Sequence, residues 1–162
     1  MGEFEKFYNK ALRFLSYRPR SEKEIRDRLK LKVQSSKFKV EENIIDKVIE
    51  KLKEQKFTND EEFTRWWIEQ RTNVQPRSMR LIKIELRQKG ISNEIIESRI
   101  KNQESGRDDA ELVKKLIEKR LSKYKGLEKR ELYQKLGRFL ASKGFDWETI
   151  KKSIDEVVKK GV

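Results

Sequence analysis

The chain has 162 residues, carries a net charge of +13 and is charged at 43% of its positions, which favours an elongated fold with thin cores over a deep spherical core. It contains no Cys and no His, so disulfides, thiol nucleophiles, thiolate or imidazole metal sites and Ser-His-Asp triads are excluded. No apolar run approaches the ~20 residues that span a bilayer, and the excess of positive charge points to an acidic partner, either a nucleic acid or an acidic protein surface.

Apolar side chains recur at spacings of three and four residues along the whole chain, and this spacing is typical of amphipathic helices. The pattern predicts nine helices in chain order, near residues 3–16, 21–32, 41–55, 59–71, 77–89, 92–102, 107–122, 128–142 and 146–159. Period-2 alternation, the sign of a strand, is absent over any useful length, so the sequence predicts an all-α fold.

Several of the expected helix ends carry capping signals. Ser21 with Glu24, and Thr58 with Glu61, have the spacing of a capping box, in which a hydroxyl and a carboxylate each accept from a free backbone N–H group. The further expected N-caps are Ser92 and Asp146. The expected helix stops are the prolines and glycines at Pro19, Pro76, Gly90 and Gly144.

The helices repeat in threes. The tripeptide Pro-Arg-Ser at residues 19–21 recurs at residues 76–78, and the Lys-Gly pair at residues 89–90 recurs at residues 143–144. Because one such repeat has little core of its own, neighbouring repeats are expected to stack and bury a continuous apolar ridge. We therefore expect one elongated, curved array of three tandem three-helix repeats, over residues 1–56, 57–103 and 104–162.

The repeat pattern also predicts the core. The matching apolar positions expected to be buried are Ile25, Leu29, Ile82, Leu86, Leu136 and Leu140. Most aromatic side chains also fit apolar faces, among them Phe14, Tyr17, Phe63, Trp67 and Phe139. Trp66 points about 100° away from Trp67 on a helix, which makes it a candidate for partial exposure. Tyr124, between two lysines, could stack on a base, although a contact at a helix end is favoured.

One helix face beside this core differs between the repeats. In the first repeat, Lys23, Arg26 and Lys30 lie at spacings of three and four on one face of the second helix, and we name them the first stripe. The second stripe occupies the equivalent positions of the second repeat, Arg80, Lys83 and Arg87. The third repeat has Gln134, Gly137 and Ala141 there. Each stripe is either an ordinary solvated face or a contact for acidic side chains or phosphates, and both interpretations stay open.

The motifs of the chain resemble those of RecX proteins. Residues 11–21 (ALRFLSYRPRS), followed by residues 24–25 and 28–29, resemble the N-terminal signature of that family. Residues 57–63 (FTNDEEF), with Trp67, Arg71 and residues 75–78, 85–86 and 89–91, are similar to its central motif. Residues 136–140 (LGRFL) and 143–145 (KGF) resemble its C-terminal repeat. The turn at residues 33–39 departs from the family, whose members often have a shorter turn there.

The resemblance implies that the protein regulates the RecA recombinase. RecX proteins bind in the helical groove of the RecA filament on DNA, and they typically inhibit filament growth, ATP hydrolysis, strand exchange and RecA-stimulated cleavage of the SOS repressor. The implied partners are the RecA filament and the single-stranded DNA within it, in DNA repair and the SOS response. We expect a monomeric, cytoplasmic protein with no cofactor, no bound metal and no membrane contact.

The residues expected to contact the partner or DNA are the two stripes and two arginines of the central motif: Lys23, Arg26, Lys30, Arg71, Arg77, Arg80, Lys83 and Arg87. The alternative function is a stand-alone basic helical module that binds DNA. An enzyme is not expected. The acidic clusters at residues 60–62 and 108–109 lie near expected helix starts, where carboxylates stabilise the positive end of the helix dipole, and no phosphate-cradling glycine motif is present.

Overall fold

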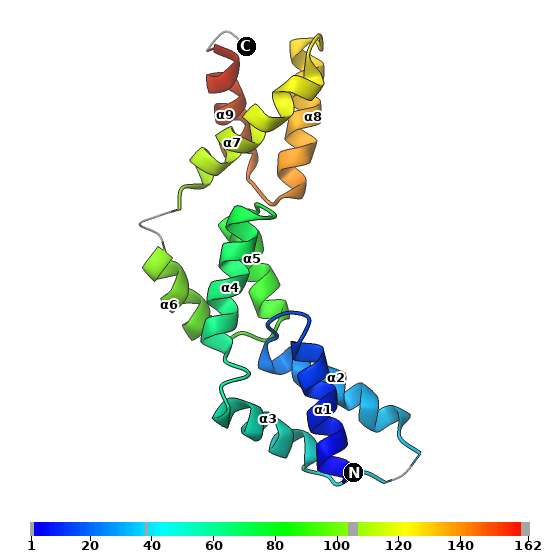
Figure 1. Cartoon of the computed structure of the whole chain (residues 1–162). Helices are drawn as coiled ribbons and strands as arrows, with labels where there is room; N and C mark the ends of the chain where they lie inside the picture. The colour runs from blue at the N-terminus through cyan, green and yellow to red at the C-terminus, as the bar shows by residue number, and fades with distance from the viewer. Residues whose placement is uncertain (1, 38, 104–106, 160–162) are drawn as a thin grey trace. The chain divides into compact units, whose positions relative to one another are not determined.

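The computed structural model describes residues 2–37, 39–103 and 107–159, and every regular element within these ranges is helical (Figure 1). The nine α-helices of the described ranges are α1 (Glu3–Leu15), α2 (Glu22–Ser35), α3 (Ile44–Glu54), α4 (Asp60–Asn73), α5 (Met79–Gln88), α6 (Asn93–Gln103), α7 (Asp109–Leu121), α8 (Lys129–Ser142) and α9 (Trp147–Lys159). A short 3₁₀ turn, η1 (Ser122–Tyr124), follows α7. The predicted all-α class is confirmed over this part of the chain. None of these helices is long and apolar enough to cross a membrane.

The helix boundaries differ from the predicted ones by a few residues. α2 continues to Ser35 instead of ending near residue 32, because no proline or glycine interrupts this stretch. The predicted turn at residues 34–39 therefore overlaps the end of α2, and residue 38 of that turn lies outside the described residues. α3 begins at Ile44 rather than near residue 41, and its N-cap position, Asn43, makes no side-chain cap hydrogen bond.

Contacts between residues group the chain into two compact units. The first unit comprises Met1–Trp67 and Leu86–Arg99, and the second comprises Ile68–Glu85 and Ile100–Val162. The division passes through α4, α5 and α6, so the second predicted repeat contributes residues to both units. The three repeats are thus units of sequence, whereas the two compact units are units of packing.

Each unit has its own apolar core. In the first unit, α1 packs against α2 and α3 around Phe7, Ala11, Ile25, Leu29, Ile44, Val48, Ile49 and Leu52. In the second unit, α9 packs against α7 and α8 around Val113, Leu116, Ile117, Leu136, Leu140, Phe145, Ile150, Ile154 and Val157. All six apolar positions that the repeat predicted are fully buried, so the predicted core is confirmed.

The aromatic side chains follow the sequence prediction except at Tyr17. Phe63 and Trp67 are buried with their ring centroids 5.7 Å apart, and Trp66 is half-buried as expected. The other aromatics of that prediction are partly buried against the two cores: Phe14, Tyr124 and Phe139. Tyr17 is 73% exposed, because α1 ends at Leu15 and residue 17 no longer continues the apolar face of the helix.

The capping box predicted at the start of α2 is present. The Ser21 hydroxyl accepts from the Glu24 N–H group, and the Glu24 carboxylate accepts from the Ser21 N–H group, both at 3.2 Å. The predicted caps Ser92 and Asp146 each accept from the N–H group three residues later, at 3.3 Å and 2.7 Å. These caps satisfy backbone donors that the first helical turn leaves free.

The second predicted capping box, at Thr58 and Glu61, is wrong by one residue. α4 begins at Asp60, and Asn59 Oδ1 accepts from the N–H groups of Glu61 and of the residue after it, at 2.9 Å and 3.3 Å. Asn is at least as good an N-cap as Thr, and it directly precedes the helix. The Thr58 hydroxyl instead donates to the carbonyl oxygen of Arg20 at 3.3 Å.

In the first unit, the start of α2 meets the end of α5. Ser21 is fully buried, and its hydroxyl donates to the carbonyl oxygen of Lys89 at 2.7 Å. Gly90 has a φ of 80° and lies so close to α2 that an added Cβ would be 2.5 Å from the Cβ of Lys23. Asp60, from the next repeat, accepts from the first N–H group of α2 at 2.9 Å. The second repeat therefore packs against the start of α2 in the first repeat and accepts hydrogen bonds from it.

The second unit contains the same contact between the start of α5 and the end of α8. The N–H group of Ser78, which is buried, donates to the carbonyl oxygen of Lys143 at 2.9 Å. Gly144 has a φ of 88°, and an added Cβ would lie 2.6 Å from the Leu81 Cβ. Asp109 accepts from the first N–H group of α5 at 3.2 Å. We name these two contacts the joints, each formed by a Pro-Arg-Ser half and a Lys-Gly half.

The outer repeats each lack one half of a joint. The third repeat has no Pro-Arg-Ser before α8: its N-cap position is Glu128, whose side chain makes no cap hydrogen bond. The first repeat has no Lys-Gly pair after α2, and the C-cap position of that helix is Ser36 in an extended conformation. Only the second repeat carries both halves.

We expect Gly90→Ala and Gly144→Ala to destabilise the protein more than Gly126→Ala. All three glycines have positive φ, and this conformation costs an L-residue about 1–2 kcal/mol. Gly126 has open space around its Cβ position, whereas the other two additions collide with the joints and should cost roughly 3 kcal/mol or more in total. Urea unfolding followed by circular dichroism measures the difference. Equal losses at the three positions would mean that the joints are loosely packed.

Candidate nucleic-acid interface

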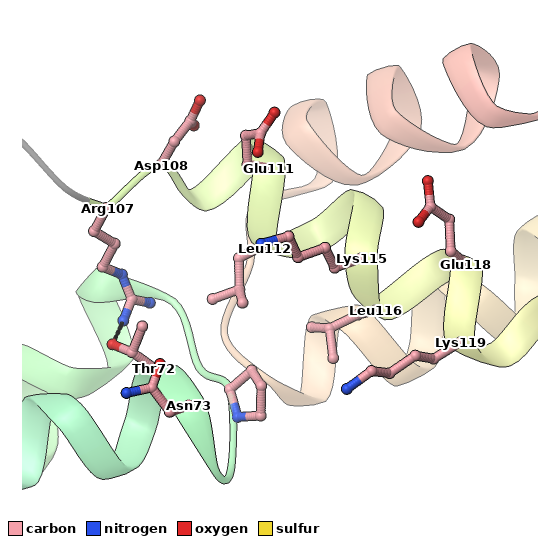
Figure 2. Close-up of a pocket in the computed structure, with 11 residues that line it drawn as sticks. Thr72, Asn73, Arg107, Asp108, Glu111, Leu112, Lys115, Leu116, Glu118 and Lys119 are labelled. Carbon is pink, nitrogen blue, oxygen red and sulfur yellow. Dashed lines mark hydrogen bonds between the residues drawn. The ribbon is translucent and has the colours of Figure 1, made fainter.

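A hollow of about 850 Å³ lies between the end of α4 and α7 in the second unit (Figure 2). Arg107, only 6% exposed, donates to the Thr72 hydroxyl and to the carbonyl oxygen of Arg77, and its Nε lies 3.1 Å from Asp109. The charged residues that line the hollow along α7 have both signs: Asp108, Glu111, Lys115, Glu118 and Lys119. This mixture does not favour a polyanion. Within the described ranges, no group of three or more carboxylates is placed to hold a metal ion.

A smaller hollow of about 310 Å³ lies between α1 and α2 in the first unit. It is lined by Lys10, Arg13, Phe14, Tyr17 and Arg28, which we name the Tyr17 cluster. The guanidinium carbon of Arg28 lies 5.6 Å from the centroid of the Phe14 ring, and the Tyr17 ring is largely in solvent. Among the described residues, none of the three cations forms an ion pair with a carboxylate. Their charges are therefore available to a ligand.

The Tyr17 cluster combines the two features that bind single-stranded nucleic acids without sequence preference, cations for the phosphates and an exposed aromatic ring for base stacking. The apolar spacing of the sequence predicts that Tyr17 lies in the core, so this cluster was not predicted. Lys10 and Arg13, at i and i+3, share one face of α1, and this spacing is the part of the cluster that the sequence could have indicated. Arg28 comes from a different helix, so only the packing of α1 on α2 brings it to the same place.

The first stripe lies on α2, but two of its three cations are already paired. Lys23 Nζ lies 2.6 Å from Asp27 Oδ2. Arg26 Nη1 lies 2.6 Å from Asp46 Oδ1, and this hydrogen bond raises the pKa of Arg26 above its ordinary value. Lys30 is exposed. A phosphate would have to compete with carboxylates for two of these three residues.

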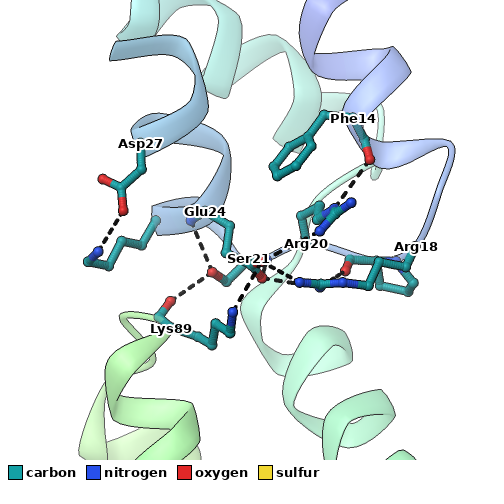
Figure 3. A network of polar contacts seen from close by, with 9 residues as sticks. Phe14, Arg18, Arg20, Ser21, Glu24, Asp27 and Lys89 are labelled. Atoms are coloured by element: carbon teal, nitrogen blue, oxygen red, sulfur yellow. Dashed lines mark hydrogen bonds and ion pairs between the residues drawn. The ribbon is translucent and has the colours of Figure 1, made fainter. Parts of the chain in front are cut away.

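Beside the first stripe, two basic side chains lie close to the Glu24 carboxylate at the joint (Figure 3). Arg18 Nη2 lies 2.6 Å and Lys89 Nζ lies 3.6 Å from its Oε2. Burial alone would raise the pKa of Glu24, but the hydrogen bonds from Arg18 and the Ser21 N–H group, with the charges of Arg18 and Lys89, outweigh it and hold that pKa below its ordinary value. Glu24 therefore stays ionised near neutral pH and keeps these two cations at the joint.

The residues of the second stripe are divided between the two compact units. Arg80 and Lys83 belong to the second unit, where Arg80 Nη2 donates to the carbonyl oxygen of Gly144 at 3.2 Å and Lys83 is half-buried. Arg87 belongs to the first unit, where its Nε donates to Asn93 Oδ1 at 3.0 Å. Arg80 and Lys23, at equivalent positions of their repeats, therefore both contact the glycine of a joint.

Arg71 and Arg77 converge on one carboxylate. Arg71 Nε lies 3.0 Å from Glu85 Oε2, and Arg77 Nε lies 3.2 Å from Glu85 Oε1. All three side chains are mostly buried, so this triplet ties the end of α4 and the turn after it to α5. The two arginines that complete the predicted site thus have a structural role in the second unit.

The chain matches the family models of the three domains of RecX, in order. The first three-helix domain matches residues 8–52, the second matches residues 59–98 and the third matches residues 107–154. These matches follow the three predicted repeats and cover most of the chain.

Curated relatives match over most of this chain. The regulatory protein RecX of Bacillus subtilis (strain 168) is 34% identical over 155 residues, which cover 96% of this chain and 56% of the relative. The regulatory protein RecX of Clostridium perfringens (strain 13 / Type A) is 38% identical over 148 residues, which cover 90% and 66%. That of Clostridioides difficile (strain 630) is 31% identical over 150 residues, which cover 93% and 67%. The chain thus spans between about half and two thirds of the length of these relatives.

Solved structures agree with the sequence matches. The crystal structure of RecX from Lactobacillus salivarius aligns with a TM-score of 0.69 and 28% identity, covering 94% of this chain and 95% of that chain. A second crystal structure, of a regulatory protein RecX, aligns with the same TM-score and identity and covers 73% of its own chain. With three domain models matched in order and this agreement in fold, the chain belongs to the RecX family of regulatory proteins.

Proposed function

We propose that this protein binds the filament that RecA forms on single-stranded DNA, and that it inhibits filament growth, ATP hydrolysis and strand exchange in DNA repair and the SOS response. Membership of the RecX family supports RecA as the partner. Direct contact with DNA is supported by the Tyr17 cluster, in which three cations without carboxylate partners among the described residues surround an exposed aromatic ring.

The Tyr17 cluster contacts the DNA strand in this proposal. A cation that is paired with a carboxylate gains little from a phosphate, because the existing ion pair has to be broken first. Lys10, Arg13 and Arg28 have no such pair among the described residues, so each can neutralise a phosphate directly. The Tyr17 ring can then stack on an unpaired base, a contact that does not depend on which base is present.

The two stripes contact acidic protein surface in the same proposal. Lys23 and Arg26 already have carboxylate partners, so the first stripe contributes mainly through the exposed Lys30. The excess of positive charge attracts an acidic surface to both stripes. Lys30, Lys83 and Arg87 are the stripe residues best tested by substitution, because the side chains of Lys23 and Arg80 lie against the joint glycines and that of Arg26 is held by Asp46.

A stand-alone DNA-binding module is the second candidate, because the Tyr17 cluster would serve it equally well. The two functions differ in their dependence on RecA and on salt. If three cations neutralise three phosphates of a single strand, log K should fall with log salt at a slope of about −2. A protein that also contacts RecA should bind the filament at salt concentrations where binding to DNA alone is lost.

The first test is ATP hydrolysis by the cognate RecA on single-stranded DNA during titration with this protein. We expect inhibition at less than one protein per RecA, because a regulator that caps or blocks a growing filament acts on many protomers at once. A titration of single-stranded DNA without RecA, at two salt concentrations, is the matched control. Unchanged ATP hydrolysis together with strong, salt-sensitive DNA binding would refute the regulatory function and support the stand-alone module.

Substitutions at the two surfaces should separate DNA binding from filament binding. We expect Tyr17→Ala to weaken binding to single-stranded DNA by about 1–3 kcal/mol, or roughly 5- to 150-fold, because one base loses its stacking partner. The triple charge reversal Lys10→Glu, Arg13→Glu and Arg28→Glu should weaken binding to both DNA and the filament. Fluorescence anisotropy with a labelled oligonucleotide, with and without RecA, measures both affinities.

The matched control reverses the same number of charges on the stripes, at Lys30, Lys83 and Arg87. We expect this variant to weaken filament binding while leaving binding to DNA alone within about twofold, and circular dichroism should show unchanged helicity. If both triple variants lose DNA binding equally, the effect comes from net charge and the Tyr17 cluster is not a specific site. If the stripe variant binds the filament normally, the stripes have no part in the interaction.

A further inference from the structure

The third repeat carries a hollow where the other two repeats carry the stripes. Its volume is about 590 Å³, and it lies between α8 and the start of α9 in the second unit. The residues that line it are Arg130, Tyr133, Gln134, Gly137, Arg138, Ala141 and Trp147. Three of them, Gln134, Gly137 and Ala141, are the residues that replace the basic triplets. The same helix face is therefore basic in two repeats and hollow in the third.

Trp147 forms an apolar wall of this hollow. It is the first residue of α9, its side chain is 59% exposed, and it reaches across to α8. A Cβ added at Gly137 would lie only 3.0 Å from Cζ3 of the indole, so the ring rests directly on the helix at a position without a side chain. A large aromatic side chain in contact with solvent, over a hollow, is typical of a surface that a partner covers.

Among the polar groups around the hollow, one already has a hydrogen-bond partner and two have no ion pair with a described residue. The Tyr133 hydroxyl is hydrogen-bonded to the Asp155 carboxylate, so it is already satisfied. Arg130 and Arg138 are exposed, and neither forms an ion pair within the part of the chain that the structure describes. The hollow therefore offers an apolar interior and two available guanidinium groups at its rim.

We propose that this hollow, which we name the Trp147 pocket, binds a segment of a partner protein that carries a large apolar side chain between acidic residues. The apolar side chain fills the space beside the Trp147 ring, and the flanking carboxylates pair with Arg130 and Arg138. Arginine suits this role because its planar donors bind a carboxylate in a bidentate manner. The proposal goes beyond regulation of RecA, because binding of such a segment requires neither DNA nor a filament.

The chemistry of the pocket favours this occupant over two others. A nucleobase carries donors and acceptors around its rim, and an apolar hollow would leave those that enter it unpaired, which disfavours binding. A leucine or phenylalanine side chain has no such groups. A second copy of this chain carries the same net charge of +13, and in a symmetric dimer it would set Arg130 and Arg138 against identical arginines, so like charges would repel.

The test uses a short synthetic peptide in which Leu-Phe-Leu is flanked on both sides by pairs of Glu, with blocked ends. Binding is followed by NMR of the full chain through the indole N–H signals of its three tryptophans, Trp66, Trp67 and Trp147. The Trp147 signal is identified by its loss in Trp147→Phe. We expect this signal to shift in a saturable manner with peptide, while the signals of Trp66, which is half-buried, and Trp67, which is buried, stay in place, because both lie in the first unit.

Two altered peptides test the two parts of the recognition. Replacing Leu-Phe-Leu by Ser-Ser-Ser removes the apolar anchor, and replacing Glu by Lys reverses the charge. Each change should weaken binding at least about tenfold, and the lysine peptide should not bind detectably. Equal binding of the glutamate and lysine peptides would overturn the proposal, as would the absence of any saturable shift with the glutamate peptide at millimolar concentration.

Two double variants complete the test with the same change in charge. Arg130→Glu with Arg138→Glu should weaken peptide binding at least about tenfold and leave binding to single-stranded DNA unchanged. Arg13→Glu with Arg28→Glu, in the Tyr17 cluster, should do the opposite. Gly137→Leu, which fills the hollow, should abolish peptide binding while helicity is retained. A Trp147 signal that shifts with an oligothymidylate more strongly than with the peptide, or with protein concentration alone, would assign the pocket to nucleic acid or to self-association and refute the proposal.

Discussion

In each compact unit, a hydrogen bond joins the start of one helix to the end of another, and the close packing at the joint depends on it. Ser21 provides the donor to the carbonyl oxygen of Lys89 in the first unit, and Ser78 provides it to Lys143 in the second. The contact sets the positive end of one helix dipole against the negative end of another. A buried carbonyl oxygen without a donor would cost about 1–3 kcal/mol, so the close approach that each joint glycine allows depends on the donor being present.

The high charge content has two distinct uses. Arg71 and Arg77 share Glu85 in the second unit, and Arg18 and Lys89 share Glu24 in the first, so basic side chains tie helices together within each unit. Other basic side chains have no carboxylate partner among the described residues, and they include those around Tyr17 in the first unit and around Trp147 in the second.

The helices and the core could be predicted from the sequence, because both depend on the local 3.6-residue period and on capping residues such as Ser21. The candidate site could be predicted less well, because it depends on pairs that only folding brings together. The ion pair of Arg26 with Asp46 joins α2 to α3, and Arg28 reaches the Tyr17 cluster only because α2 packs on α1. Tyr17 fits an apolar spacing in the sequence, but that spacing has no meaning once α1 has ended.

The joint halves are distributed unequally over the repeats, and this distribution sets the order in which the repeats join and the number that can join. The first repeat offers only the Pro-Arg-Ser half, the third offers only the Lys-Gly half, and the second offers both. Among the described residues, each half that stands at the start or the end of the second helix of a repeat is used once. Head-to-tail polymerisation through an interface of this kind needs an unused half at both ends, and these positions offer none. Because each outer repeat has only one joint half, it is equivalent in this respect to a capping repeat of a longer solenoid protein. A designed extension would have to copy the second repeat, which has both halves.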